Sequence, residues 1–451
     1  MSVESKPSVR RFQSIFSDAI LGASLLWTGL PETVVGKIYI ASVPLNVFLF
    51  YLAIASFAFE HMIGGRSLRR PSLLLLTAAL AMFLMATMGF LQGAEFRWWA
   101  IDFSMFLGLP YGFLWVGQRG IAEAARLLQQ WALIFSVLLL ANLAGLAVGL
   151  IPPANEGSRL FTYAVFNCTN FIAVILPCLF VAAWQRKLPG AHYREMCLAY
   201  IGAACIFLAG VFAATRSILL LSTVSVSLGY WVSTKSRMSW VAWITPTAVI
   251  GGYALLGLGA STFLVDRLRQ TNLSDEDRFV EVELMFEDMA GPADYILGRG
   301  FGSRFHSSVV VDGDDRALTP HVGVLSTLYK GGAVVFTVVV VLPFVLASFQ
   351  LLQFQGTRIE LGFAASVVLY IVLSSMSGGW NNGLLFVYGV SIAASSGSRR
   401  KRVTTLVTAR PVGVRGLRGP LLPHGQRRGR ASELILAKAI EYESLPYHQQ
   451  S

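Results

Sequence analysis

Charged residues are scarce in this chain of 451 residues. Asp, Glu, Lys and Arg together supply 14% of the sequence, whereas hydrophobic residues supply 55%. Soluble globular domains carry about a quarter charged residues. The composition therefore excludes an ordinary water-soluble domain and indicates a protein with many membrane-spanning segments.

Cysteine is also rare, with four residues in the whole chain. All four lie inside or beside apolar runs and lack the spacing of metal ligands: Cys168, Cys178, Cys197 and Cys205. They are expected to pack as small hydrophobic side chains. The cysteines therefore predict neither a zinc site nor a disulfide framework.

Apolar runs of about 20 residues recur along the chain. Such a run suits a membrane-spanning helix, since ~30 Å of hydrocarbon needs that length at 1.5 Å per residue. Twelve runs have their centres near Leu25, Phe48, Ala81, Phe106, Leu140, Ile172, Phe207, Val224, Leu255, Val339, Val367 and Phe386. The sequence predicts an all-α polytopic membrane protein of about twelve transmembrane helices, the first of them short.

These runs divide the chain into five parts. A cytoplasmic N-terminus of residues 1–14 precedes spans 1 to 9 within residues 15–264, and spans 10 to 12 lie within residues 321–397. Between the two sets lies a polar loop, residues 265–320, which collects charge and glycine. The last part, residues 398–451, is a basic tail rich in Gly, Pro and Arg, a composition that predicts a disordered cytoplasmic segment.

Arginine and lysine are distributed unevenly between the two sides of this layout. With the N-terminus inside, 25 of the 36 basic residues fall on the cytoplasmic side, where membrane proteins carry their excess. The loop of residues 265–320 then lies on the outer face. Most of the net charge of +11 comes from the tail, whose expected partner is the anionic membrane surface, and no nucleic acid is needed to explain it.

The outer loop contains a predicted amphipathic helix. Ser274 is suitable as its N-cap and Gly291-Pro292 as its end, and one apolar stripe recurs at spacings of three and four: Phe279, Val282, Phe286 and Met289. Arg278 lies beside this stripe and can face the membrane surface. It can equally be a surface residue that balances Glu281 and Asp275.

Three further features of the outer side carry candidate chemistry. The turn Gly298–Gly302, with Arg299 and Arg304 beside it, can offer backbone amides to a phosphate or can simply be a tight turn. His321 stands at the outer end of the tenth run, as an acid–base group or as a polar anchor. Arg216 lies in a short outward turn at the edge of hydrocarbon, where a guanidinium generally has an anionic partner such as a phosphate.

Four short motifs follow one another between Val211 and Gly332: ATRSILLL, DEDRF, ILGRGFGS and PHVGVLSTLYKGG. Together they resemble motifs of the O-antigen ligase and O-antigen polymerase superfamily, bacterial membrane glycosyltransferases that act on undecaprenyl-linked glycans. Arg216 matches the Arg of the family's Ser-Arg-Gly motif, with Ser217 in place of the glycine. Arg278 matches a second Arg in the loop, and His321 matches the His of a His-Asn segment, with Val322 in place of the Asn.

The resemblance implies transfer of a glycan from undecaprenyl pyrophosphate to an acceptor hydroxyl at the periplasmic face of the inner membrane, without metal or cofactor. Arg216 and Arg278 are then expected to stabilise the leaving pyrophosphate, and His321 to orient or deprotonate the acceptor hydroxyl. Candidate substrate-binding residues are Arg299, Gly300, Gly302, Arg304 and Glu281. A chain-length regulator and a flippase are expected partners.

Two functions within this family stay open. A polymerase extends one lipid-linked repeat with another, and a ligase transfers the finished glycan to lipid A core; the polymerase is slightly favoured. A lipid-linked glycan flippase or transporter is the alternative from another class. Asp18, Glu60, His61 and Asp102 lie towards span ends, whereas ion-coupled transporters need ionisable residues near mid-membrane.

The first testable prediction is the sidedness of the loop and the tail. A membrane-impermeant thiol reagent applied to intact spheroplasts is expected to label Asp312→Cys and to leave Arg428→Cys unlabelled, because the basic residues favour an inside tail. Labelling at position 428 with protection at position 312 would reverse the topology.

Overall fold

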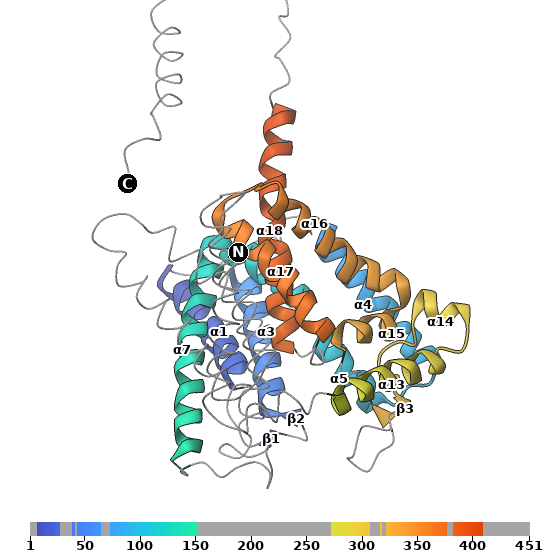
Figure 1. The fold of residues 1–451 in the computed structure, drawn as a ribbon. Coiled ribbons are helices and arrows are strands. Elements are labelled where there is room, and N and C mark those ends of the chain that lie inside the picture. Colours follow the sequence, from blue (N-terminus) through green and yellow to red (C-terminus); the bar gives the residue numbers. More distant parts are fainter. Residues whose placement is uncertain are drawn as a thin grey trace, which may run out of the picture. The chain divides into compact units, whose positions relative to one another are not determined.

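The computed structural model in Figure 1 describes nine stretches of the chain: residues 7–27, 38–40, 43–64, 73–148, 150, 272–306, 316–317, 322–376 and 382–408. The apolar runs centred near Ile172, Phe207, Val224 and Leu255 lie outside these stretches, as does the tail after residue 408. Two units divide at Arg402, and all the described elements belong to the first, apart from the last residues of α18.

The described part is mostly α-helical, and its helices coincide with the other eight apolar runs. They are α1 (Pro7–Trp27), α3 (Leu45–Gly64), α4 (Leu73–Leu91), α5 (Phe96–Phe106) with α6 (Gly108–Arg119), α7 (Ile121–Ala147), α15 (Gly323–Phe336) with α16 (Leu342–Leu352), α17 (Arg358–Met376) and α18 (Asn382–Thr408). Within the described part, two helical stretches, Phe96–Arg119 and Gly323–Leu352, are long and apolar enough to cross a membrane. The second is kinked at Gly332, whose φ of +63° and ψ of −173° are not helical.

The second of these stretches contains a short π-helix, η1 (Thr337–Val341). Pro343 follows it and has no backbone N–H, so the carbonyl of Val339 cannot receive its usual helical hydrogen bond. The hydroxyl of Tyr388 donates to that carbonyl at 2.6 Å from α18. A buried polar group that the proline would leave unpaired is thus satisfied by a neighbouring helix.

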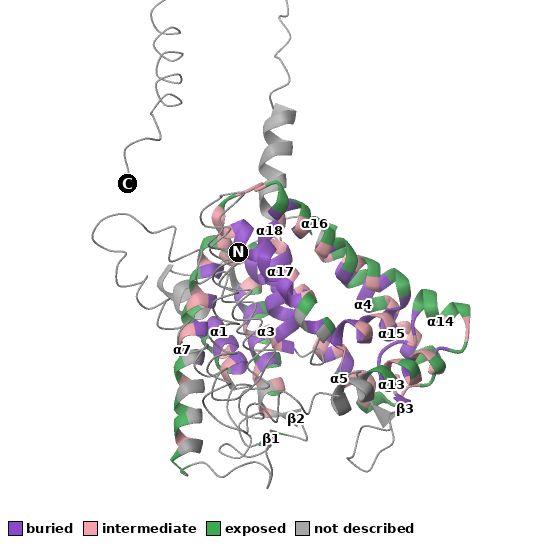
Figure 2. Cartoon of the chain, in the orientation of Figure 1, coloured by how far each residue is buried: buried purple, intermediate pink, exposed green. Residues whose placement is uncertain are grey.

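Apolar side chains are exposed on the outward faces of two helices (Figure 2). On α4 these include Leu76, Leu80, Phe83 and Phe90, and on α16 they include Leu342, Val345, Phe349 and Leu352. Their spacing of three, four or seven residues places each set on one side of its helix. Such faces are costly in water and are those expected of helices that contact lipid.

The outer loop folds into two helices and a small hairpin. α13 (Asn272–Asp288) is followed by α14 (Pro292–Leu297), and β3 (Phe305–His306) pairs antiparallel with β4 (Arg316–Ala317). A second two-residue pair, β1 (Tyr39–Ile40) with β2 (Val43–Pro44), joins α1 to α3. α14 packs against α15, and α13 contacts β3.

Three details of the predicted loop helix were wrong. α13 begins at Asn272, before the expected cap, and Gly291-Pro292 starts α14 because proline suits the first turn of a helix. The predicted apolar stripe is right for Phe286 and Met289, which belong to a buried cluster, but wrong for Phe279, which is 77% exposed. The buried residues of α13 are Glu281 and Met285, and Met289 lies just beyond its end. Met285 and Met289 are buried because they pack with Phe305 and Tyr329, neighbours that the local sequence pattern does not include.

Glycines bring α6 and α18 into close contact. A Cβ atom on Gly112 would lie 2.4 Å from the carbonyl oxygen of Phe386, and one on Gly108 would lie 2.5 Å from that of Asn382. Gly389 makes the reciprocal contact, since its Cβ would lie 2.4 Å from the carbonyl oxygen of Leu109. Small residues at this spacing let helix backbones approach each other, as is common in membrane bundles.

We therefore expect Gly112→Val to force α6 away from α18 and to destabilise the protein by about 1–3 kcal/mol, the usual cost of overpacking. The thermal midpoint of purified protein in one fixed detergent measures this loss. Gly117→Val on the same helix is the matched control, because a Cβ there meets nothing within 4 Å. Equal midpoints for the two variants would contradict a tight α6–α18 contact.

Candidate functional site

The outer loop is attached to the helices by a buried ion pair. Lys330 of α15 donates to Oδ2 of Asp102 in α5, and the backbone N–H of Gly302 donates to the same oxygen at 2.6 Å. Both charged side chains have no solvent exposure. Since an unpaired charge in such surroundings is very costly, the pair fixes α5, α15 and the loop relative to one another.

The glycine turn Gly298–Gly302 packs directly on helix backbone. Three successive N–H groups donate to the protein: Arg299 to the carbonyl of Tyr329 at 2.8 Å, Gly300 to that of Lys330 at 2.9 Å, and Phe301 to that of Met85 at 2.9 Å. Gly302 donates to Asp102. These four amides are therefore already used, which favours the tight turn over the phosphate cradle.

Gly300 shows why glycine is needed in this turn. Its φ is +81°, a region that other residues rarely adopt, and a Cβ there would lie 1.9 Å from the backbone nitrogen of Gly89 in α4. Gly302 also has a φ of +81°, and its Cβ would lie 2.7 Å from the backbone nitrogen of Trp99. The two candidate substrate-binding glycines thus dock the loop onto α4 and α5.

Arg299 neutralises acidic residues of the loop. Its guanidinium lies 3.2 Å from Asp294 and 3.4 Å from Asp288. Burial lowers the pKa of Arg299, but Asp288, Tyr329 and Asp294 together raise it more, so the net shift is upward. The hydroxyl of Tyr329 donates to Asp288 at 2.6 Å, which joins the end of α13 to α15.

Arg304 contributes to a different cluster. Its guanidinium carbon lies 4.3 Å from the ring centroid of Trp98 in α5, and that of Arg97 lies 4.9 Å from the same ring. Both distances are within the range of cation–π attraction. Two cations from distant parts of the chain thus meet on one indole.

Of the other predicted site residues, only Glu281 has a described side chain. Glu281 lies in α13 and is 1% exposed. The backbone of Arg278 is part of α13, but its side chain lies outside the described part, as do Arg216 and His321 entirely. The convergence of Arg216, Arg278 and His321 therefore stays a prediction. α13 is nevertheless bonded to α15, whose first residue, Gly323, comes two positions after His321.

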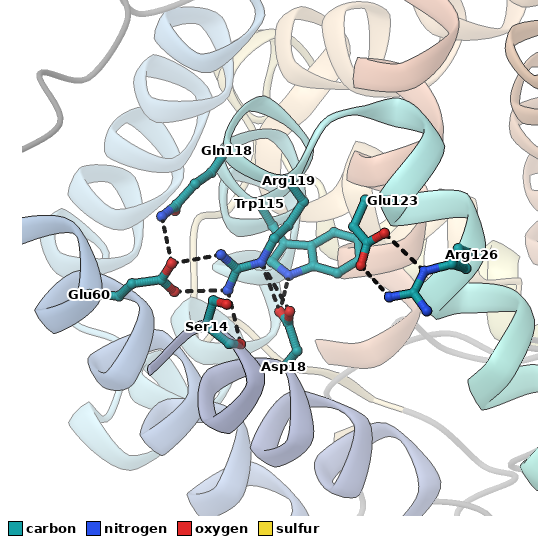
Figure 3. Close-up of polar contacts among 8 residues, drawn as sticks. All are labelled: Ser14, Asp18, Glu60, Trp115, Gln118, Arg119, Glu123 and Arg126. Atoms are coloured by element: carbon teal, nitrogen blue, oxygen red, sulfur yellow. Dashed lines mark hydrogen bonds and ion pairs between the residues drawn. The ribbon is translucent and has the colours of Figure 1, made fainter. Parts of the chain in front are cut away.

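A second charged cluster lies among α1, α3 and α6 (Figure 3). Arg119 donates to Oδ2 of Asp18 at 3.0 Å and to the two oxygens of Glu60 at 2.7 and 2.8 Å. Trp115 donates to Asp18 at 2.8 Å, and Gln118 donates to Glu60 at 3.1 Å. The side chains of Arg119, Asp18 and Glu60 are 8%, 11% and 9% exposed, so one guanidinium serves two buried carboxylates.

Sequence reasoning missed both sets of buried charges. It placed Asp18, Glu60 and Asp102 towards span ends but named no partners for them. The predicted topology could have indicated the partners of Asp18 and Glu60. It places Asp18, Glu60 and Arg119, in spans 1, 2 and 4, all towards the cytoplasmic side. The same rule puts Asp102 and Lys330 at the outer side.

Within the part of the chain that the structure describes, no group of three His, Cys, Asp or Glu side chains could hold a metal ion. Comparison of the sequence with protein-family models and with curated proteins found no match. The functional interpretation therefore rests on the sequence motifs and on the contacts described above.

The Asp102–Lys330 pair can be tested by a double-mutant cycle. Lys330→Met leaves Asp102 charged and buried, so we expect a loss of about 3–5 kcal/mol in stability. Asp102→Asn with Lys330→Met is expected to recover much of it, because the amide oxygen can still accept from Gly302 and no charge remains. Thermal midpoints in one detergent measure both, with the exposed Glu123→Gln as control. A double variant no better than Lys330→Met would contradict the uncompensated-charge explanation.

Proposed function

We propose that this protein is a multi-span bacterial inner-membrane glycosyltransferase with about twelve transmembrane helices. It transfers a glycan from undecaprenyl pyrophosphate to an acceptor hydroxyl at the periplasmic face, and a repeat-unit polymerase is the favoured form. The observation that carries the proposal is that the loop of residues 265–320, which contains Arg278 and the glycine turn and is followed by His321, is bonded to α4, α5 and α15.

The contacts of this loop support the proposal because they bring its motifs to one region. The DEDRF motif lies in α13, ILGRGFGS is the end of α14 with the following turn, and the last motif runs into α15. Asp288 bonds to Tyr329, and Gly302 and Lys330 both bond to Asp102. Segments that a catalytic site needs near one another are thus rigidly joined.

The proposed chemistry assigns one task to each charged residue. Pyrophosphate is a good leaving group once its developing charge is stabilised, which two arginines, Arg216 and Arg278, can do without a metal. His321 orients or deprotonates the acceptor hydroxyl for an inverting displacement. Arg299 is already engaged with two carboxylates, so within this proposal it organises the loop.

A ligase that uses lipid A core as acceptor fits the same contacts equally well. A lipid-linked glycan transporter, the alternative from another class, gains some support from the buried charges of α1, α3, α5 and α6. In the structure, however, Asp18, Glu60 and Asp102 each bond to a cationic side chain. Carboxylates paired in this way are suited to holding helices together. An ion-coupled transporter would instead need a carboxylate that can bind and release the coupling ion.

The deciding assay gives purified protein a lipid-linked glycan donor and acceptor without ATP or an ion gradient. A glycosyltransferase lengthens or transfers the glycan under these conditions, whereas a transporter leaves every glycan at its original mass. In a deletion strain, accumulation of single repeats indicates a lost polymerase. A full ladder retained on undecaprenyl pyrophosphate indicates a lost ligase.

In that assay, Arg216→Lys is expected to retain part of the activity and Arg216→Ala almost none, because lysine keeps the charge but lacks the forked donors. His321→Ala is expected to reduce transfer by about 10²- to 10⁴-fold, the usual contribution of a general base, while donor binding persists. Arg126→Ala, far from the loop motifs in sequence, is the control. A well-inserted His321→Ala protein with parental activity would remove His321 from the mechanism.

A further inference from the structure

Two helical stretches expose apolar residues over nearly the thickness of a membrane. On α4 the exposed residues run from Leu73 to Phe90, which is about 26 Å at ~1.5 Å per residue. On α15 and α16 they run from Val334 to Leu352, about 27 Å at the same rise. Since the hydrocarbon core of a bilayer is about 30 Å thick, the end of each stripe near the outer loop marks the edge of the hydrocarbon.

α14 of the outer loop contacts both helices at that edge. Gln92, two positions after the α4 stripe ends, donates to Asp294 of α14 at 3.3 Å. On the other helix, a Cβ atom on Gly332, two positions before that stripe begins, would lie 2.3 Å from the carbonyl oxygen of Ile296. α14 therefore lies at the level where the two lipid-facing stripes end.

Apolar side chains are exposed on α14 itself (Figure 2). Tyr295, Ile296 and Leu297 are consecutive and are 42%, 52% and 36% exposed. Leu91 and Phe96, at the adjoining ends of α4 and α5, are exposed as well. Single exposed apolar residues are normal on any protein surface, but several gathered beside two lipid-length stripes are expected where a surface meets a membrane.

The position of α14 is fixed by polar contacts. Asp294 accepts from Gln92 and lies 3.2 Å from the guanidinium of Arg299. The hydroxyl of Tyr295 donates to the carbonyl of Phe286 in α13 at 3.2 Å, and the two rings stack with centroids 6.3 Å apart. The exposed apolar residues of α14 are thus presented by backbone that is bonded to α4 and α13.

We infer that α14 and the adjoining ends of α4 and α5 form a surface that docks on the bilayer, with Ile296 and Leu297 among the outermost acyl carbons. The occupant is lipid because this surface continues two stripes whose length matches the hydrocarbon. Short apolar segments at this level are stabilised by partial immersion in the headgroup region. The inference rests on the membrane location in the proposed function and adds the depth of the loop, which is then held at the level of a lipid-linked pyrophosphate.

The test measures the depth of single side chains by electron paramagnetic resonance. Full-length protein, with its four native cysteines replaced by Ala, carries one nitroxide in liposomes of phosphatidylethanolamine and phosphatidylglycerol. Power saturation compares collisions with oxygen, which concentrates in hydrocarbon, and with a nickel chelate, which stays in water. The labelled positions are Ile296→Cys and Leu297→Cys. Phe83→Cys, within the α4 stripe, is the lipid reference, and Glu287→Cys, exposed on α13, is the water reference.

We expect the oxygen-to-chelate collision ratio at Ile296 and Leu297 to be several-fold higher than at Glu287 and to approach the ratio at Phe83. Ratios equal to that at Glu287 would place α14 in water and overturn the docking surface. Few collisions with either reagent would mean that protein covers these residues, as in an assembly of two copies, and would overturn it as well. Two labelled positions keep the test decisive if one label disturbs the loop.

This measurement needs no substrate, so its failure differs from a failure of the proposed function. A nitroxide at Phe83 that collides with the chelate as freely as one at Glu287 would contradict the membrane location on which both proposals rest. Lipid contact at Phe83 with water at Ile296 and Leu297 would remove the docking surface alone. A protein whose α14 is in lipid but that transfers no glycan would refute the proposed function and leave the docking surface standing.

Discussion

The arrangement of the outer side depends on one buried interaction, the bond of Lys330 and the Gly302 amide to the same oxygen of Asp102. Two charges without solvent exposure are stable only when each compensates the other, so α5 and α15 cannot separate without a large cost. Because the loop amide donates to the same carboxylate oxygen as Lys330, the loop is fixed together with the helices. The close contact of Gly300 with Gly89 follows from this constraint, since side chains on either residue would keep the loop away from α4.

A second buried cluster, among α1, α3 and α6, uses related chemistry with a different balance of charge. Arg119 bonds to both Asp18 and Glu60, while Trp115 and Gln118 each donate to a carboxylate oxygen that also accepts from Arg119. Planar guanidinium donors can serve two carboxylates at once, which a lysine cannot do as well. Buried ion pairs therefore hold specific helices of the described part together. Apolar contacts alone would select these neighbours poorly, because in a membrane the lipid tails are as apolar as the side chains.

The contacts of the loop show what its arginines and its glycine turn do in the described part of the chain. Arg299 bonds to Asp288 and Asp294 and serves the internal order of the loop. Arg97 and Arg304 both lie over the ring of Trp98 in α5. The glycine turn resembles a phosphate cradle in sequence. Its backbone amides donate instead to the carbonyls of Tyr329, Lys330 and Met85 and to the carboxylate of Asp102.

The sequence by itself determined the helical class and the positions of the eight apolar runs that the structure describes as helices, because the length of an apolar run is a local property of the chain. It also located the loop helix and the glycine turn. Only the tertiary structure decided which face of α13 is buried, because Met285 becomes buried by packing against Phe305 and Tyr329. It alone paired Asp102 with Lys330, 228 positions away. Ion pairing depends on the distance between side chains in space, and no periodicity along the chain encodes which two buried charges will meet.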